Sequence, residues 1–303
     1  MKQGTSRKTT FYCRNRPSIL QKICAGQTHF QKRYRREGLS EEAVFKEINL
    51  HSSCLKGLPP HLTTIFHYAL TEMVNNAIDH SQSNWVRVIV GSSSAAIHFS
   101  VMDSGVGIFE NIRAKKRLGS EMEALQDLLK GKQTTAPTHH SGEGVFFTSK
   151  IADRFIIQSH KKELLVDNQI DDLFVTTKRN KVGTFVYFEL QRTSQRRLEE
   201  IFHQYTGENF RFDTSQVAVK LFSEGEEYIS RSQAKRLIHS LEVFEKITLD
   251  FKGVKVVGQG FADEVFRVFL LQHPNIKIIP INCSEDVQFM INRAKNSSES
   301  LTN

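Results

Sequence analysis

The segment LTEMVNNAIDH, residues 70–80, is the centre of the pattern that decides the fold. Across residues 62–80, apolar side chains recur every three or four positions, which predicts an amphipathic helix with one buried face. At about 100° per residue, Glu72, Asn76 and Asp79 fall on a narrow strip beside that face. A ligand held between a helix and a sheet would meet this strip. The apolar positions are Ile65, Phe66, Ala69, Leu70, Met73, Val74 and Ala77.

Glu72 and Asn76 stand one helical turn apart and offer different chemistry. A hard divalent cation takes oxygen ligands and keeps several waters, so the amide oxygen of Asn76 together with phosphate oxygens suits Mg²⁺. The carboxylate of Glu72 could orient or deprotonate an attacking group. The alternative is an ordinary solvated helix edge, an interpretation that two glycine motifs further along the chain disfavour.

The first glycine motif is Asp103-Ser104-Gly105-Val106-Gly107-Ile108. It follows an expected hairpin of residues 85–90 and 96–102, so Asp103 ends a strand. The two glycines let the backbone turn sharply and approach a flat ligand. The Asp103 carboxylate can accept a hydrogen bond from the exocyclic amine of adenine. Taken alone, the motif is also consistent with a plain Asp-x-Gly turn.

The second motif, Ser141-Gly142-Glu143-Gly144-Val145-Phe146, opens a helix expected over residues 145–152. The N–H groups at a helix start, together with the helix dipole, suit a triphosphate. Before it, residues 112–141 combine a charged helix, roughly Glu121 to Lys130, with a polar stretch that is typical of a lid or binding loop. The three motifs in this order predict an ATP site.

The motifs resemble the N, G1 and G2 boxes of the gyrase, Hsp90, histidine kinase and MutL ATPase superfamily. The resemblance covers roughly residues 60–192, including a strand over residues 183–190 that is similar to the family's closing Gly-Thr strand. It implies a two-layer α+β sandwich of the Bergerat ATP-binding type, within the α/β class, over residues 46–195. It also implies ATP and Mg²⁺ as cofactors.

Carried over residue by residue, the resemblance implies a role for each motif position. Glu72 would be the catalytic acid that polarises water or an acceptor hydroxyl, Asn76 the Mg²⁺ ligand, and Asp103 the adenine-binding aspartate. The upstream histidines lack the acidic residue and later proline of a phosphoacceptor box, so autophosphorylation on histidine is not expected. Further cofactor contacts are implied for Asp79, Gly105, Gly107, Ile108, Gly142, Glu143, Gly144, Val145 and Thr184.

A second, small α/β domain is expected over residues 205–297, because strand and helix patterns alternate there. The run from Ile247 to Val257 resembles the STAS domain of anti-sigma-factor antagonists, in the STAS-like variant fused to this ATPase type. The antagonists carry a phosphorylated serine in the next loop. Here residues 256–266 contain no hydroxyl side chain, so that phosphorylation cannot occur. We expect a module that binds a protein partner.

The first 36 residues hold ten Lys or Arg and no Asp or Glu, and without them the net charge of +8 would become −2. Such a segment suits salt-dependent contact with a phosphate backbone, or it is a solvated arm. Residues 4–12 resemble the tail of a wing, and residues 30–42 resemble the linker helix that follows a winged helix. Residues 1–45 are therefore expected to be a basic arm and linker helix with weak, sequence-independent DNA binding.

The composition bounds the remaining expectations. An apolar content of 39% suffices for two ordinary cores. No window approaches eighteen apolar residues, and the four scattered cysteines suit reduced thiols, so we expect a cytoplasmic protein without a membrane role. A homodimer stays open. Two functions remain: a histidine-kinase-like or anti-sigma-like ATPase or protein kinase in signal transduction or transcription control, and a non-catalytic, ATP-gated module that binds DNA or protein.

Overall fold

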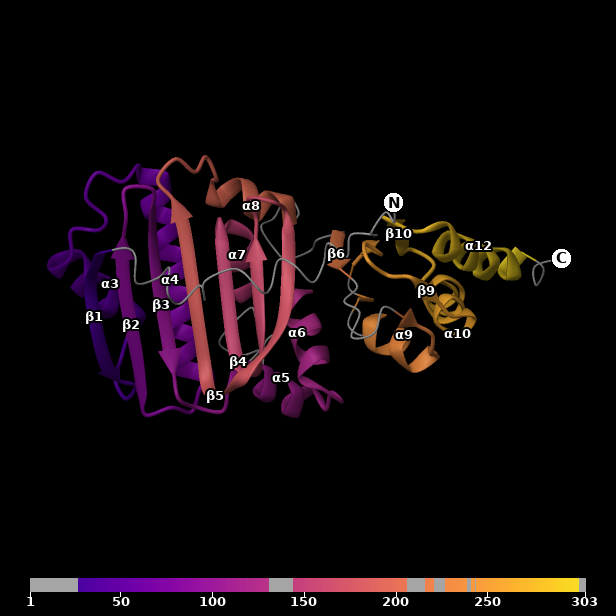
Figure 1. Cartoon of the computed structure of the whole chain (residues 1–303), viewed down its shortest axis with the longest axis horizontal. Coiled ribbons are helices and arrows are strands. Elements are labelled where there is room, and N and C mark those ends of the chain that lie inside the picture. The colour runs from indigo at the N-terminus through magenta and orange to yellow at the C-terminus, as the bar shows by residue number, and fades with distance from the viewer. Residues whose placement is uncertain are drawn as a thin grey trace, which may run out of the picture.

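The computed structural model describes residues 27–130, 144–205, 216–220, 227–238, 241–242 and 244–299. The predictions for the wing tail, for residues 131–143, and for Gly142 and Glu143 lie outside the described residues. Within the described ranges the chain forms a five-stranded antiparallel sheet, a three-stranded parallel sheet and a two-stranded ladder (Figure 1). The expected fold class, an α+β sandwich followed by a small α/β domain, is confirmed.

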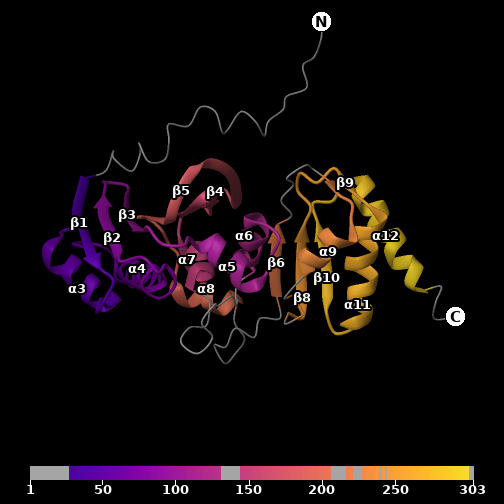
Figure 2. The same ribbon diagram turned by 90° about the horizontal axis from the view of Figure 1, so that it is seen from below.

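The antiparallel sheet has the strand order β1-β2-β3-β5-β4. The expected hairpin over residues 85–102 is confirmed, since β2 and β3 pair along their length. Helices α3 and α4 lie on one side of β1 and β2 (Figure 2). The strands are β1 Gln27–Arg35, β2 Trp85–Ser92, β3 Ala96–Asp103, β4 Arg154–Asp167 and β5 Asp172–Gln191; the helices are α3 Glu41–His51, α4 Pro60–His80, α5 Ile108–Lys116, α6 Glu121–Leu129, α7 Gly144–Ile151 and α8 Leu198–Tyr205.

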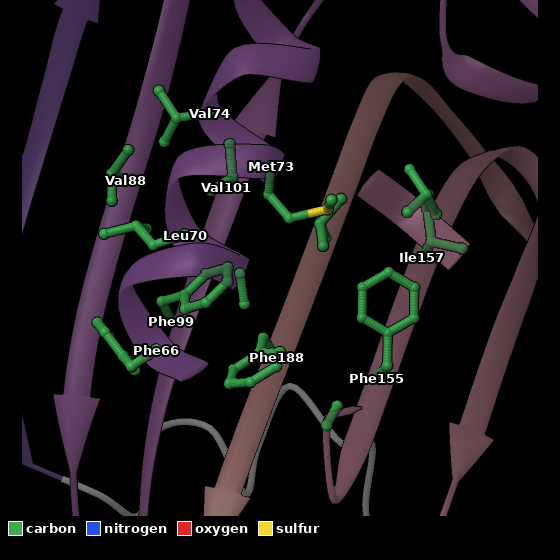
Figure 3. Packing of buried hydrophobic residues seen from close by; sticks show 14 of the residues in the cluster. Phe66, Leu70, Met73, Val74, Val88, Phe99, Val101, Phe155, Ile157 and Phe188 are labelled. Carbon is green, nitrogen blue, oxygen red and sulfur yellow. The ribbon is translucent and has the colours of Figure 1, made fainter. Parts of the chain in front are cut away.

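Helix α4 buries the apolar face that its periodicity predicts. All seven of the predicted apolar positions are buried, and none is more than 5% exposed. Phe66 meets Phe99 of β3 edge to face at 5.4 Å, and Phe99 stacks on Phe188 of β5 at 4.9 Å between ring centroids (Figure 3). Fully burying each such side chain contributes roughly 1.5–3 kcal/mol. This packing fixes the rotation of α4 and therefore the direction of its polar strip.

Strand β1 shows that the expected linker helix over residues 30–42 is wrong. Phe30 and Tyr34 are buried in the main core, while Lys32 pairs with Glu47 of α3. Phe30, Lys32 and Tyr34 are alternate residues, which share one face of a strand. The antiparallel pairing of Gln27–Arg35 with β2 makes this segment an edge strand and not a helix. The charged side chains of Lys32 and Arg33 interrupt the apolar pattern, so the two-residue repeat of a strand was not evident from the sequence. The sheet therefore begins before residue 46.

Strands β4 and β5 form a long hairpin with a bend, visible as an arch in Figure 2. The register shifts between Ser159 and Lys162, and His160 has a positive φ of 49°. Beyond the bend, Leu165 packs into a small cluster that is separate from the main core. This cluster alternates along the strands with core residues, so it lies on the sheet face opposite α4. Its buried members are Ile156, Leu165, Phe185 and Tyr187.

The C-terminal unit has the alternating strands and helices that the sequence predicts. Its parallel sheet has the order β10-β8-β6. The Ser284 side chain accepts a hydrogen bond from the Val287 N–H at 3.3 Å and caps the last helix. Every helix of the described ranges is too short or too polar to span a lipid bilayer. The elements are β6 Gln216–Lys220, β7 Glu227–Tyr228, α9 Arg231–Ile238, β8 Lys246–Asp250, β9 Val256–Val257, α10 Gln259–Asp263, the π-helical η1 Glu264–Val268, α11 Phe269–Gln272, β10 Lys277–Ile281 and α12 Glu285–Glu299.

Candidate nucleotide-binding site

A cavity of about 280 Å³ lies where α4 faces the sheet. Its wall is built from α4, β3, the start of α5, the end of α6, the start of α7, β4 and β5. Residues from all three sequence motifs meet in it. The predicted site residues that line it are Glu72, Asn76, Asp103, Gly107, Ile108, Gly144, Val145 and Thr184.

Asp103 lies at one end of the cavity wall and is only 9% exposed. Its Oδ1 accepts hydrogen bonds from the N–H of Gly105 at 2.9 Å and of Thr184 at 3.2 Å. Burial raises the pKa of the Asp103 carboxyl, and the hydrogen bonds from Gly105 and Thr184 oppose that rise. A carboxylate has about four acceptor positions, so capacity remains for an amine of a ligand. This end of the cavity suits the amino edge of adenine.

Gly107 shapes the wall beside Asp103. Its φ of +79° is a conformation that other residues rarely adopt, and a Cβ there would collide with the Ser159 hydroxyl and the His160 ring. The next residue, Ile108, begins α5 and donates its N–H to the Thr184 hydroxyl at 3.1 Å. The motif after β3 and the Gly-Thr start of the closing strand are therefore tied together at this end of the cavity.

Gly144, Glu72 and Asn76 form the part of the wall where α7 begins. A Cβ on residue 144 would overlap the Glu72 carboxylate, so a larger residue there would displace that flexible side chain. The amide nitrogen of Asn76 is buried and has no hydrogen-bond partner among the described residues. Rotation of the amide would present its oxygen instead. These residues fit Mg²⁺ and the phosphates of ATP: Asn76 has an unmatched polar group, and α7 begins at Gly144 in the cavity wall, where the N–H groups of a helix start suit phosphate oxygens.

Two residues that were predicted to contact the cofactor, Asp79 and Gly105, do not line the cavity. Asp79 is exposed on α4 and does not line the cavity, because α4 turns that edge of the strip toward solvent. Gly105 lies behind the wall, where a Cβ would overlap the Ser81 carbonyl. Its role is to let the turn pack on α4, since the neighbouring N–H of Val106 donates to the Ser81 oxygen at 2.8 Å.

Sequence reasoning missed four polar residues of the wall: Asn75, His80, Ser81 and Asn111. His80 follows Asn76 by four residues, so helical spacing places it on the same side of α4 and would have identified it. Asn111 stands three residues after Ile108, on the first turn of α5, and its amide donates to the His80 carbonyl at 3.4 Å. That helix was not expected, so its facing residues were not considered.

Two protein-family models match parts of the chain. Residues 62–194 match the family model described as histidine kinase-, DNA gyrase B- and HSP90-like ATPase. Residues 233–288 match the model described as a STAS-like domain of unknown function. A search of curated proteins gave no match. The first matched range contains all the cavity residues, and the second contains most of α9 and all of β8 and α10.

Proposed function

Since residues 62–194 form an ATPase domain of the histidine kinase, DNA gyrase B and HSP90 type and residues 233–288 a STAS-like domain, we propose an ATP-dependent regulatory protein. It binds Mg-ATP and acts in signal transduction or transcription control. With Glu72 it hydrolyses ATP slowly or transfers the γ-phosphoryl group to a protein. The observation that carries this proposal is the meeting of Glu72, Asn76, Asp103 and Gly144 in one cavity.

Asp103 selects the base in this proposal. Its carboxylate is held by two backbone N–H groups and can accept from the 6-amino group of adenine. Guanine presents an oxo group at that position, and two acceptors facing each other leave both without a donor. ATP should therefore bind more tightly than GTP.

Asn76 and Glu72 act at the phosphates. Asn76 would hold Mg²⁺ through its amide oxygen, and the ion would neutralise charge that develops on the phosphate oxygens. Glu72 lies one turn earlier on the same cavity wall, where its carboxylate can take the proton of an attacking water or protein hydroxyl. This carboxylate occupies the place that a Cβ on residue 144 would take.

A second function, an ATP-gated binding module, is favoured by the packing of α7. This helix begins with Gly144 in the cavity wall, yet its Phe146 and Phe147 are buried in the same cluster as the core of the STAS-like domain. Phe147 also stacks on Phe202 of α8 at 4.2 Å. A ligand that binds one position of α7 better than another would therefore change the packing of the STAS-like domain, without any chemistry.

Incubation of the pure protein with γ-labelled ATP and Mg²⁺ tests the first function, with free phosphate and labelled protein as the two readouts. Glu72→Gln should keep nucleotide affinity within a few-fold and lower turnover by about 10²–10⁴. Glu199→Gln is a matched control, since it removes an exposed carboxylate of α8 that does not line the cavity. Equal turnover by Glu72→Gln and the parent would remove Glu72 from the mechanism. Failure of the parent to bind ATP would refute both functions.

The gated module has its own test. Hydrogen exchange of the full chain, with and without Mg-ADP, should show altered protection in α9 and β8, because both belong to the domain that packs on Phe146 and Phe147. Altered protection without phosphate release would favour the module over the enzyme. Unchanged exchange in those segments, at saturating nucleotide, would exclude coupling through α7.

A further inference from the structure

Strands β1 and β2 carry a group of arginines around the single tryptophan of the chain. The register places Arg33 opposite Arg87 and Arg35 opposite Trp85. Paired residues of neighbouring strands share a face, and alternate residues of one strand do so too, so these four side chains lie together. The guanidinium groups of Arg33 and Arg35 lie 4.5 and 5.5 Å from the centroid of the Trp85 ring.

This face of β1 and β2 is exposed. The alternate residues Phe30, Lys32 and Tyr34 face α3, where Lys32 and Tyr34 both contact Glu47. The arginines therefore lie on the opposite side of the strand, and all three are exposed. Figure 2 shows α3 and α4 on one side of β1 and β2 and no described helix on the other.

The charges on this face have no counterpart within the described residues. No carboxylate there pairs with Arg33, Arg35 or Arg87, whereas Lys32 on the other face pairs with Glu47. Arg33 and Arg87 stand directly opposite each other, and like charges in that relation destabilise a sheet. An anion that contacts both guanidinium groups would remove the repulsion. The arrangement is therefore complementary to a negatively charged partner.

Three features favour a long polyanion over other anions. Arginine binds phosphate through two parallel N–H groups, and three arginines in one patch require several phosphates. Two arginines of the patch, Arg33 and Arg35, also belong to a segment of 36 residues that has ten Lys or Arg and no acid. The strands carry none of the exposed large apolar side chains that a lipid surface would take up. Among the described residues those side chains are Leu50, Ile170, Val182, Ile229, Val256, Leu271, Ile281 and Phe289.

We propose that the face formed by Arg33, Arg35, Trp85 and Arg87 binds the phosphate backbone of nucleic acid. The Trp85 ring is covered by two guanidinium groups, so it orients them and is not available to stack on a base. Phosphate contacts without base contacts give affinity without sequence preference. This surface is separate from the nucleotide cavity, so either proposal can fail while the other stands.

The test compares two triple variants of the full chain by fluorescence anisotropy with a short labelled DNA duplex of mixed sequence. Arg33→Gln/Arg35→Gln/Arg87→Gln removes the proposed contacts. Lys161→Gln/Lys178→Gln/Arg179→Gln is the matched control, which removes the same charge from exposed positions near the bend of the β4–β5 hairpin. Substitutions are preferable to deleting residues 1–36, since that deletion would also remove β1 with its buried Phe30 and Tyr34.

The parent should bind the duplex with an affinity that falls steeply between about 50 and 200 mM salt. The arginine variant should lower the slope of log K against log salt by roughly 2–3, at about 0.9 per lost contact, and weaken binding at least about tenfold near 0.1 M salt. The control should change both quantities much less. Mg-ATP affinity should stay at the parental value and the melting temperature should not fall below that of the parent, which shows that the fold is intact.

Three results would overturn the proposal. In the first, the parent binds neither duplex nor single-stranded DNA. The two triple variants could lose affinity equally, which would indicate a diffuse charge effect and no defined surface. The arginine variant could keep its DNA affinity but lose binding to vesicles that contain phosphatidylserine, which would assign the face to an anionic membrane surface instead.

Discussion

Asp103→Asn is the sharpest test of the nucleotide site. Oδ1 of Asp103 accepts from the N–H groups of Gly105 and Thr184, and the carbonyl oxygen of an asparagine can keep both bonds. The turn after β3 should therefore survive the substitution. The other end of the side chain changes from an acceptor to a donor, so it can no longer accept from the adenine amine.

The expected loss follows from the burial of the group. Removing a charge-assisted hydrogen bond in a site that is only 9% exposed costs roughly 1–3 kcal/mol, which is about 5- to 150-fold in Kd. Burial also raises the pKa of the parental carboxyl. Parental ATP affinity should therefore weaken as pH falls through that raised pKa, because the protonated form no longer accepts as an anion.

The free energy of unfolding should depend on pH in the opposite direction from ATP affinity: it should fall as pH rises. A carboxyl whose pKa is higher in the folded than in the unfolded protein stabilises the fold at low pH, and this contribution is lost as pH rises through the folded-state pKa. The parent should therefore lose stability relative to Asp103→Asn over that pH range, which urea unfolding at several pH values would measure.

Calorimetric titration with ATP and GTP, in the presence of Mg²⁺ and at several pH values, measures the Kd of each nucleotide and its pH dependence. Comparison with Asp103→Asn separates the titration of Asp103 from that of the nucleotide phosphates. Equal affinity of the parent for ATP and GTP would refute the assignment of Asp103 to adenine. So would an Asp103→Asn variant that binds ATP as the parent does at every pH.

Three further predictions concern other described residues. Asn76→Ala should weaken Mg-ATP binding more than binding of ATP in a chelator, because the amide oxygen serves the ion; titrations with and without Mg²⁺ check this. Gly144→Ala should lower ATP affinity while the melting temperature stays near that of the parent, since a Cβ would displace the Glu72 carboxylate, and an unaltered affinity would contradict the close approach. Burial lowers the pKa of Lys130 from 10.5 to about 8. The unfolded chain then binds more protons than the folded one between these values, so stability should rise by up to roughly 3 kcal/mol from about pH 8 to 10. Lys130→Met should abolish this rise in urea unfolding.

Local periodicity was enough to predict α4 and the chemistry of its polar strip. The 3.6-residue repeat determines which side chains share a face, whatever the helix packs against. The same holds for the turn after Asp103 and for the helix that starts at Gly144, because glycine spacing and helix-start chemistry act within a few residues. These local signals determined the order of the motifs, and together with the family resemblance they predicted the fold class and eight of the residues that line the cavity.

Contacts between distant segments decided the rest. The resemblance to a winged helix predicted a linker helix over residues 30–42, but pairing with β2 and burial of Phe30 and Tyr34 make β1 an edge strand. Asp79 shares the strip of Glu72, yet the rotation of α4 against the sheet turns it toward solvent. The sequence predicted only that Phe146 and Phe147 are apolar residues of a helix. Tertiary packing places them in the same buried cluster as the core of the second domain. Sequence patterns determine which side chains share a face, whereas register and packing across distant segments determine what that face meets.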